Sequence, residues 1–199
     1  MTKRSTHPGR RHTFCRLARF ALVAGMLAAP LQSAYADLND WLCLTENTRG
    51  SWEARTTFIA AVSEAAEEFR IAPAVLMAIK LQESGPHLNP AITNSNTNGT
   101  IDRGYFQINV STWLRELRRI GVPIDEHDLH GVRNNALTAA WVLSRELRGR
   151  DLIEGVGRYH KGSGDDARAR QIRQTYTTGF RAHLQNLVEQ CGSQHEVSP

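Results

Sequence analysis

Apolar residues recur every three or four positions along much of this chain, which is the spacing that lines one face of an α-helix. Ser51 is a typical N-cap residue. The apolar positions that follow it are Phe58, Ala61, Val62, Ala65 and Phe69. A second apolar stretch begins at Pro73, a residue tolerated in the first helical turn, and ends near Ser84, where Pro86 stops it. The pattern predicts two consecutive helices.

The segment from His87 to Ile101 has a different composition, rich in Asn, Thr, Gly and Pro. These residues favour turns, because their side chains bond to the local backbone or because they allow positive φ. We therefore expect a long ordered loop between the second helix and the rest of the chain.

Helical spacing returns beyond this loop. It predicts a short helix capped by Ser111 and running through Ile120, a helix from Asn134 or Asn135 to Gly149, and a helix over about 152–160. A last long helix carries the stripe Ile172, Tyr176, Phe180, Leu184 and Leu187. The predicted fold class is all-α, with room for one very small β element near the loop, in a single domain.

The length of 199 residues and the 41% hydrophobic content are ordinary for a globular protein. No apolar run reaches the roughly 18 to 20 residues of a membrane-spanning helix, so we expect no stable membrane insertion. The formal charge of +4 arises at the N-terminus, since residues 1–36 hold six bases and no acid. A nucleic-acid-binding domain needs fixed cations in its folded part, so the charge pattern argues against a nucleic-acid partner.

The N-terminal segment has the three parts of a secretory signal peptide. A basic stretch extends to Arg19, an apolar stretch runs from Phe20 to Leu31, and small residues surround Tyr35. We expect cleavage before Asp37, although an uncleaved N-terminal anchor is the alternative. The predicted organisation is a signal peptide over 1–36, one domain over 37–192 and a polar tail over 193–199.

Removal of the signal takes Cys15 with it and leaves Cys43 and Cys191 near the two ends of the remaining chain. An exported protein meets an oxidising compartment, so we expect these two residues to form a disulfide. The alternative is a pair of unrelated thiols.

Glu83 is a polar residue at the end of an otherwise apolar helix, directly before the Asn- and Gly-rich loop. A carboxyl group there can donate a proton to a leaving oxygen, while the amides and hydroxyls of the loop bind a polar substrate. By position alone, a glutamate at a helix end is more often solvated or capping.

Further motifs follow this glutamate in a fixed order. They are Glu83-Ser84, Asn89-Pro90, Asn96-Thr97-Asn98-Gly99-Thr100, Asp102, Gly104, Gln107-Ile108-Asn109 and Tyr159-His160-Lys161-Gly162. The set resembles the lytic transglycosylases, and most closely the small single-domain members that accompany conjugation, type III or type IV secretion and pilus machines. The resemblance covers roughly residues 41–165 and implies a goose-type, lysozyme-like fold.

The resemblance also implies roles for individual residues. Glu83 would be the sole catalytic acid and base, Ser84 would help to orient it, and Gln107 would line the sugar cleft. Tyr159 would match the tyrosine that forms a hydrogen bond near the catalytic carboxylate, and Thr100 would lie close to the N-acetyl group of the substrate. Purely structural roles are the alternatives: a buried amide for Gln107, a core aromatic for Tyr159 and a turn residue for Thr100.

Two positions depart from the family pattern. Tyr105-Phe106 replaces the common Leu-Met and keeps an apolar wall. His160 replaces the asparagine that usually follows the tyrosine, which places a titratable ring among the expected substrate-binding residues.

The reaction implied by the resemblance is cleavage of the MurNAc-GlcNAc bond of peptidoglycan with formation of 1,6-anhydro-MurNAc. No cofactor is required, and the expected partners are periplasmic glycan strands and an envelope-spanning machine. Two alternatives remain. One is a hydrolytic muramidase, for which Asp102 is the nearest second carboxylate, and the other is a peptidoglycan-binding subunit without activity.

Two segments have side chains that could ligate a metal. Asn94, Asn96 and Asn98 follow the spacing of an EF-hand loop, but they are uncharged, and Tyr105 stands where that loop needs a bidentate glutamate. The segment Asp125–His130 matches no recognised ligand pattern and is predicted to be a surface turn. We therefore expect no metal site.

Overall fold

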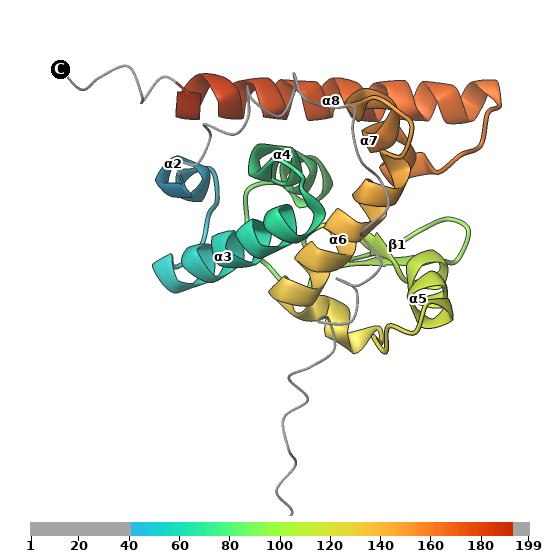
Figure 1. Cartoon of the computed structure of the whole chain (residues 1–199), viewed down its shortest axis with the longest axis horizontal. Helices are drawn as coiled ribbons and strands as arrows, with labels where there is room; N and C mark the ends of the chain where they lie inside the picture. The colour runs from blue at the N-terminus through green and yellow to red at the C-terminus, as the bar shows by residue number, and fades with distance from the viewer. Residues whose placement is uncertain (1–40, 193–199) are drawn as a thin grey trace, which may run out of the picture.

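The computed structural model of the protein describes residues 41–192, so the predicted signal peptide over 1–36 and the polar tail over 193–199 lie outside the described residues. Within it, helices dominate and α8 lies along one side of the molecule (Figure 1). In chain order the elements are α2 (Trp41–Glu46), α3 (Trp52–Phe69), α4 (Pro73–Ser84), β1 (Thr93–Ser95), β2 (Ile101–Arg103), β3 (Ile108–Asn109), α5 (Val110–Arg119), the 3-10 helix η2 (His127–His130), α6 (Val132–Glu146), α7 (Leu152–Lys161) and α8 (Ala167–Gly192). The predicted mainly α fold with a very small β element is confirmed.

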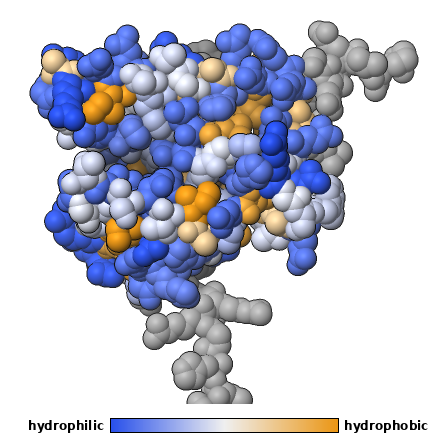
Figure 2. All heavy atoms as spheres, turned by 180° about the vertical axis from the view of Figure 1, so that it is seen from behind, coloured by the Kyte–Doolittle hydropathy of each residue, from blue (hydrophilic) through white to orange (hydrophobic). Residues whose placement is uncertain are grey.

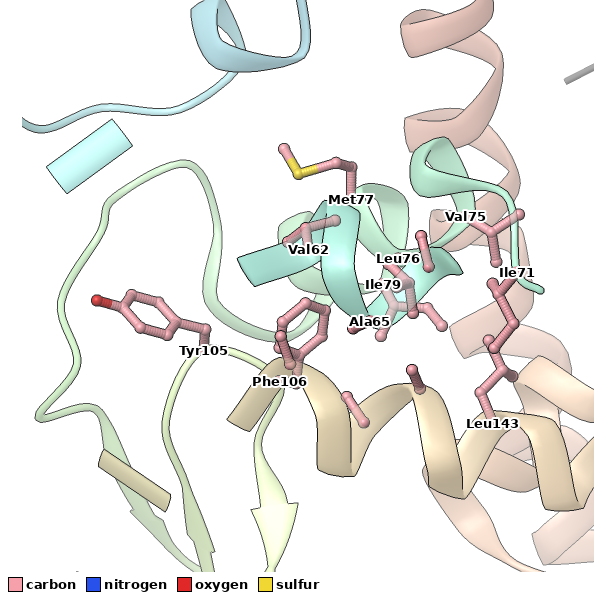
Figure 3. Close-up of a cluster of buried hydrophobic side chains, with 14 of the residues drawn as sticks. Val62, Ala65, Ile71, Val75, Leu76, Met77, Ile79, Tyr105, Phe106 and Leu143 are labelled. Atoms are coloured by element: carbon pink, nitrogen blue, oxygen red, sulfur yellow. The ribbon is translucent and has the colours of Figure 1, made fainter. Parts of the chain in front are cut away.

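Helix α4 forms the centre of the core. Every residue from Ala74 to Lys80 is buried, because α3 and α8 pack against it from different sides. Figure 3 shows Leu76 and Ile79 of α4 among side chains from α3, α6 and the turn that follows β2. Full burial of a large aliphatic side chain stabilises a fold by about 1.5–3 kcal/mol. The core therefore holds rigidly the helix whose last turn carries Glu83.

Most helix boundaries agree with the apolar spacing, and two starts do not. Ser51 caps α3 as predicted, since its hydroxyl accepts a hydrogen bond from the Ala54 amide at 3.2 Å. The prediction of Ser111 as the cap of α5 was wrong, because the side chain of Asn109 accepts from the Thr112 amide at 3.1 Å and the helix begins at Val110. The prediction for α6 was also wrong, since this helix begins at Val132 rather than at Asn134 or Asn135.

The predicted long loop contains β1 and the first residue of β2, which belong to a three-stranded antiparallel sheet in the order β1-β2-β3. Thr93 pairs with Arg103 and Ser95 with Ile101, which leaves 96–100 as the hairpin turn. β2 in turn pairs with β3, with Asp102 opposite Asn109. The turn-forming composition describes the hairpin tip correctly. The strands are too short and polar to show a period-two apolar pattern, so the sequence carried no signal for them.

The predicted disulfide is present. Cys43 of α2 is bonded to Cys191 near the end of α8, with their Cα atoms 5.5 Å apart. Both cysteines are buried. The bond joins the two ends of the described part of the chain and fixes α2 against α8.

Lys80 is a charged residue inside the core. It is fully buried on α4, and its ammonium group donates to the carbonyl oxygens of Gly85 and of His87, the latter at 3.0 Å. It also lies 5.6 Å from the centre of the Phe58 ring. These contacts hold the chain where it turns directly after Glu83. Burial lowers the pKa of Lys80 from 10.5 to about 8.

The lowered pKa of Lys80 predicts a pH-dependent stability. Between pH 8 and 10.5 the unfolded chain holds a proton at this position that the folded protein has released, so the contribution of Lys80 to the free energy of unfolding rises with pH across this range. We expect a gain of about 2 kcal/mol from about pH 7.5 to 9.5, measured by urea denaturation. Above about pH 10 the trend should reverse, because burial raises the pKa of Tyr159 and of Tyr176. A Lys80→Met variant should lack the gain, and a flat profile in the unaltered protein would contradict the assignment.

Candidate functional site

A cleft of about 950 Å³ lies between the small sheet with the start of α5 and the junction of α7 with α8. Polar residues of the hairpin line one wall, and residues 158–162 with the first turn of α8 line the other. A smaller hollow of about 420 Å³ adjoins the cleft and is lined by Gln82, Gln171, Thr175 and Tyr176. Glu83 and His160 line both spaces, so they stand where the two meet. The space-filling view shows a mainly hydrophilic surface with small apolar groups (Figure 2).

Glu83 lies in the last turn of α4, where the cleft and the smaller hollow meet, and its side chain is only 11% exposed. The Tyr176 hydroxyl donates to Oε1 of Glu83 at 2.7 Å. Nδ1 of His160 lies 3.7 Å from the same oxygen. Both contacts converge on Oε1, which orients the carboxyl group and leaves Oε2 for a ligand.

Tyr176 and His160 form one unit beside the carboxylate. Their rings are stacked, with centroids 4.1 Å apart and planes within 6° of parallel, although one residue comes from α8 and the other from α7. Burial and the charge of Glu83 raise the pKa of Tyr176, so its hydroxyl remains a hydrogen-bond donor at any working pH.

The hydrogen bond to the Glu83 carboxylate itself is donated by Tyr176, whereas Tyr159 forms its hydrogen bond close by. The Tyr159 hydroxyl donates to the carbonyl oxygen of Phe106 at 2.7 Å and ties α7 to the turn after β2. Tyr159 still lies near the carboxylate, since burial and the charge of Glu83 raise the pKa of its hydroxyl. Sequence analysis placed Tyr176 only on the apolar stripe of the last helix, and its polar end had no local signal.

Ser84 acts on the end of α4 rather than on the carboxyl group. Its hydroxyl donates to the carbonyl oxygen of Tyr105 at 2.7 Å, and the Lys80 carbonyl lies 3.2 Å away. Any orienting effect on Glu83 therefore passes through the backbone of the last helical turn.

The turn over 104–107 places Gln107 on the cleft wall. Gly104 has a φ of +73°, and a Cβ atom there would come within 2.4 Å of the Asn135 amide nitrogen, so only glycine fits. Gln107 itself has a φ of +48°, which is rare for a residue with a side chain. Its amide donates to the Gly104 carbonyl at 2.7 Å and accepts from Asn94 at 2.5 Å.

Asn135 is a residue whose role sequence analysis missed. It is completely buried, accepts a hydrogen bond from the Phe106 amide at 2.9 Å, and donates to the carbonyl oxygens of Arg103 and Leu129. A buried amide with all of these partners fixes the turn that carries Gln107. Its place beside Asn134 near a predicted helix start had suggested a cap.

Thr100 and Asp102 belong to one polar network in the hairpin. The Thr100 hydroxyl donates to Asn98 at 2.8 Å and accepts from Asn96 and Asn109, each at 3.0 Å. Oδ1 of Asp102 accepts from Asn109 at 2.7 Å, and Oδ2 accepts from Asn96 at 2.9 Å. Both oxygens of Asp102 thus stabilise the loop, while Thr100 lies at the cleft surface.

Asp166 also lines the cleft, but it caps α8. Its Oδ1 accepts from the Ala169 amide at 2.9 Å, and hydrogen bonds from the backbone lower the pKa of Asp166. Among the carboxylates that line the cleft in the described part of the chain, Glu83 therefore stands apart. Its partner is a tyrosine hydroxyl, which leaves it free to exchange a proton with a substrate.

Metal-ligating groups are not gathered here. Over residues 41–192, no cluster of three or more His, Cys, Asp or Glu side chains could hold a metal ion. Asp125 and Asp128 accept hydrogen bonds from each other's backbone amides, as expected of a turn. The same described residues include no helix long and apolar enough to cross a membrane.

Comparison with protein families gives one finding. A family model described as the transglycosylase SLT domain matches residues 60–191, which include Glu83, the hairpin, His160 and Tyr176. No curated protein and no solved structure matches the chain.

Proposed function

Because the chain belongs to the transglycosylase SLT domain family and has its lysozyme-like, mainly α fold, we propose that it is a lytic transglycosylase with Glu83 as its catalytic residue. The observation that carries the assignment of the residue is the position of this glutamate. It lies where the cleft and the smaller hollow meet and is oriented by Tyr176. Among residues 41–192, no second uncommitted carboxylate lines the cleft.

The proposed reaction needs one acid and base. Glu83 gives its proton to the glycosidic oxygen, so that the bond between this oxygen and C1 of MurNAc breaks and GlcNAc leaves with a hydroxyl group. The resulting carboxylate then takes the proton of the MurNAc C6 hydroxyl, whose oxygen bonds to C1. The product is 1,6-anhydro-MurNAc, and the glutamate is protonated again for the next cycle.

The hydrogen bonds that Asp102 accepts favour the formation of 1,6-anhydro-MurNAc over hydrolysis. Most glycosidases use a second carboxylate, either as nucleophile or to activate water. In this cleft Asp102 accepts two side-chain hydrogen bonds, and an intramolecular attack by the C6 hydroxyl makes such a group unnecessary.

The shape of the site suits a polymer. The cleft and the smaller hollow lie on either side of Glu83, so a glycan strand can occupy both with its scissile bond at the carboxylate. Gln107 and Thr100 present amide and hydroxyl groups on one wall, and His160 lies at the junction, in keeping with substrate contacts from all three.

We further propose that the protein is exported to the periplasm and makes local openings in the cell wall for a secretion, conjugation or pilus machine. The signal-peptide pattern of residues 1–36 supports export, and the resemblance to the small machine-associated members supports the role.

Digestion of purified peptidoglycan followed by mass spectrometry tests the activity. We expect soluble products with 1,6-anhydro ends, one water lighter than the products of a hydrolytic muramidase. Fully hydrated reducing ends would assign the protein as a lysozyme-type hydrolase. Binding to peptidoglycan without any soluble product would assign it as a non-catalytic subunit.

Tyr176→Phe is expected to reduce kcat about tenfold to a hundredfold with little change in KM. The substitution keeps the ring stacked on His160 and removes only the hydrogen bond to Glu83, and a bond to a charged group contributes about 1.5–3 kcal/mol. Tyr159→Phe is the matched control, because it removes a buried hydrogen bond to Phe106 and should lower stability more than kcat. Equal losses of kcat in both variants would contradict the orienting role of Tyr176.

A further inference from the structure

Lysine, arginine and aspartate side chains line only the larger of the two spaces that meet at Glu83. Gln82, Gln171 and Thr175 line the smaller hollow with uncharged groups. In contrast, Lys161 at the end of α7 and Arg168 in the first turn of α8 line the larger cleft. Asp102 and Asp166 also line it, but both accept hydrogen bonds from groups of the protein itself. Both cations are exposed, and they stand on the wall opposite the hairpin.

In the described part of the chain, neither of these two side chains forms a close ion pair with a nearby acid, although the charge of Lys161 contributes to lowering the pKa of Asp166. Asp165 pairs with Arg170 and Arg173, and Asp166 caps the first turn of α8. Within the described residues, neither Lys161 nor Arg168 forms an ion pair within 4 Å. The remaining cation of this wall, Arg158, is already paired with Glu154 at 3.0 Å.

The positive charge is concentrated in one segment, residues 158–173, and the backbone between α7 and α8 in this segment is held in place. Residues 158–173 hold five bases and two acids, whereas acids outnumber bases over 37–199. Arg173 donates to the carbonyl oxygens of Gly162 and Gly164, which holds the segment between α7 and α8 in place. A concentration of like charge on the wall of a cleft raises the local concentration of an oppositely charged ligand.

The chemistry of the substrate indicates what these cations bind. While the lactyl carboxyl groups of MurNAc are amide-linked to stem peptides, the glycan backbone is uncharged and the carboxylates of peptidoglycan lie on those peptides. We propose that Lys161 and Arg168 form a subsite for the stem-peptide carboxylates, so that the enzyme selects peptide-bearing over peptide-free glycan strands. This inference rests on the proposed function, since it assumes that the cleft holds a peptidoglycan strand.

Binding in a Glu83→Gln background tests the subsite separately from turnover. The ligands are soluble glycan fragments of equal length, either with intact stem peptides or with the peptides removed by an amidase and the freed lactyl carboxyl groups converted to methyl amides. We expect Kd to be about tenfold lower for the peptide-bearing fragments at low salt, with the preference declining as salt screens the charges. Lys161→Gln/Arg168→Gln should reduce the preference to about twofold or less. Arg118→Gln/Arg148→Gln, which removes the same charge at exposed positions outside the cleft, should retain it.

Each outcome decides the inference. Equal Kd values of the Glu83→Gln protein for the two fragments would overturn it. It would also be overturned if the substitutions at Lys161 and Arg168 raised the Kd for both fragments by the same factor. If the preference depends on Lys161 and Arg168 but the unaltered protein releases no product from peptidoglycan, the subsite stands and the proposed catalytic function fails.

Discussion

Glu83→Gln is expected to abolish peptidoglycan cleavage, with a loss at or above about ten-thousandfold, while the fold persists. Glutamine keeps nearly the same shape and can still accept the hydrogen bond from Tyr176, but it cannot transfer a proton. General acid or base catalysis contributes about a hundredfold to ten-thousandfold for one proton transfer. In the proposed reaction both transfers fall on this one residue, so the loss should reach the upper end of that range.

The measurement is product release from peptidoglycan at matched protein concentration, with thermal unfolding as the check on folding. Glu53→Gln, at an exposed position in the first turn of α3, is the matched control and should leave release unchanged. Asp102→Asn should retain far more activity than Glu83→Gln, because Asp102 is engaged in the hairpin network. Near-normal release by a folded Glu83→Gln protein would show that another residue performs the chemistry, and an equal loss in Asp102→Asn would favour a two-carboxylate mechanism.

Loss of the disulfide is expected to produce the largest change in stability. Cys43 and Cys191 are 148 residues apart, and closing a loop of that length lowers the entropy of the unfolded chain by the equivalent of about 5 kcal/mol in the simple model. We expect Cys43→Ser/Cys191→Ser to lower the free energy of unfolding by about 2–5 kcal/mol, since strain and residual structure reduce the ideal value.

Urea denaturation with and without reductant measures this effect. Reductant should destabilise the unaltered protein by nearly the same amount as the double substitution, and it should have no effect on the double variant. Equal stability of the two proteins without reductant would mean that the cysteines are not bonded in the folded protein.

Local sequence determined the helices whose apolar spacing is long and regular. The stripe after Ser51 and the apolar run from Pro73 both form helices at the predicted positions. The first segment has one apolar face and the second is apolar nearly all round, and both patterns are properties of the segment itself. The prediction of a bonded Cys43 and Cys191 needed only the export pattern and the count of cysteines that remain. The place of Glu83 at the end of an apolar helix was likewise legible from its neighbours alone.

Only the tertiary structure decided which side chains surround that glutamate. Tyr176 lies 93 residues from Glu83 in sequence, and its apolar spacing could not show that its hydroxyl reaches the carboxylate. The strands of the hairpin and the buried role of Asn135 likewise depend on partners distant in sequence. Periodicity reports how one segment divides between core and solvent, whereas hydrogen bonds between segments depend on how the helices pack. The amino-acid sequence alone therefore determined most of the helices and the position of Glu83 at a helix end. Packing determined that Tyr176 orients its carboxyl group and that Lys161 and Arg168 line the cleft beside it.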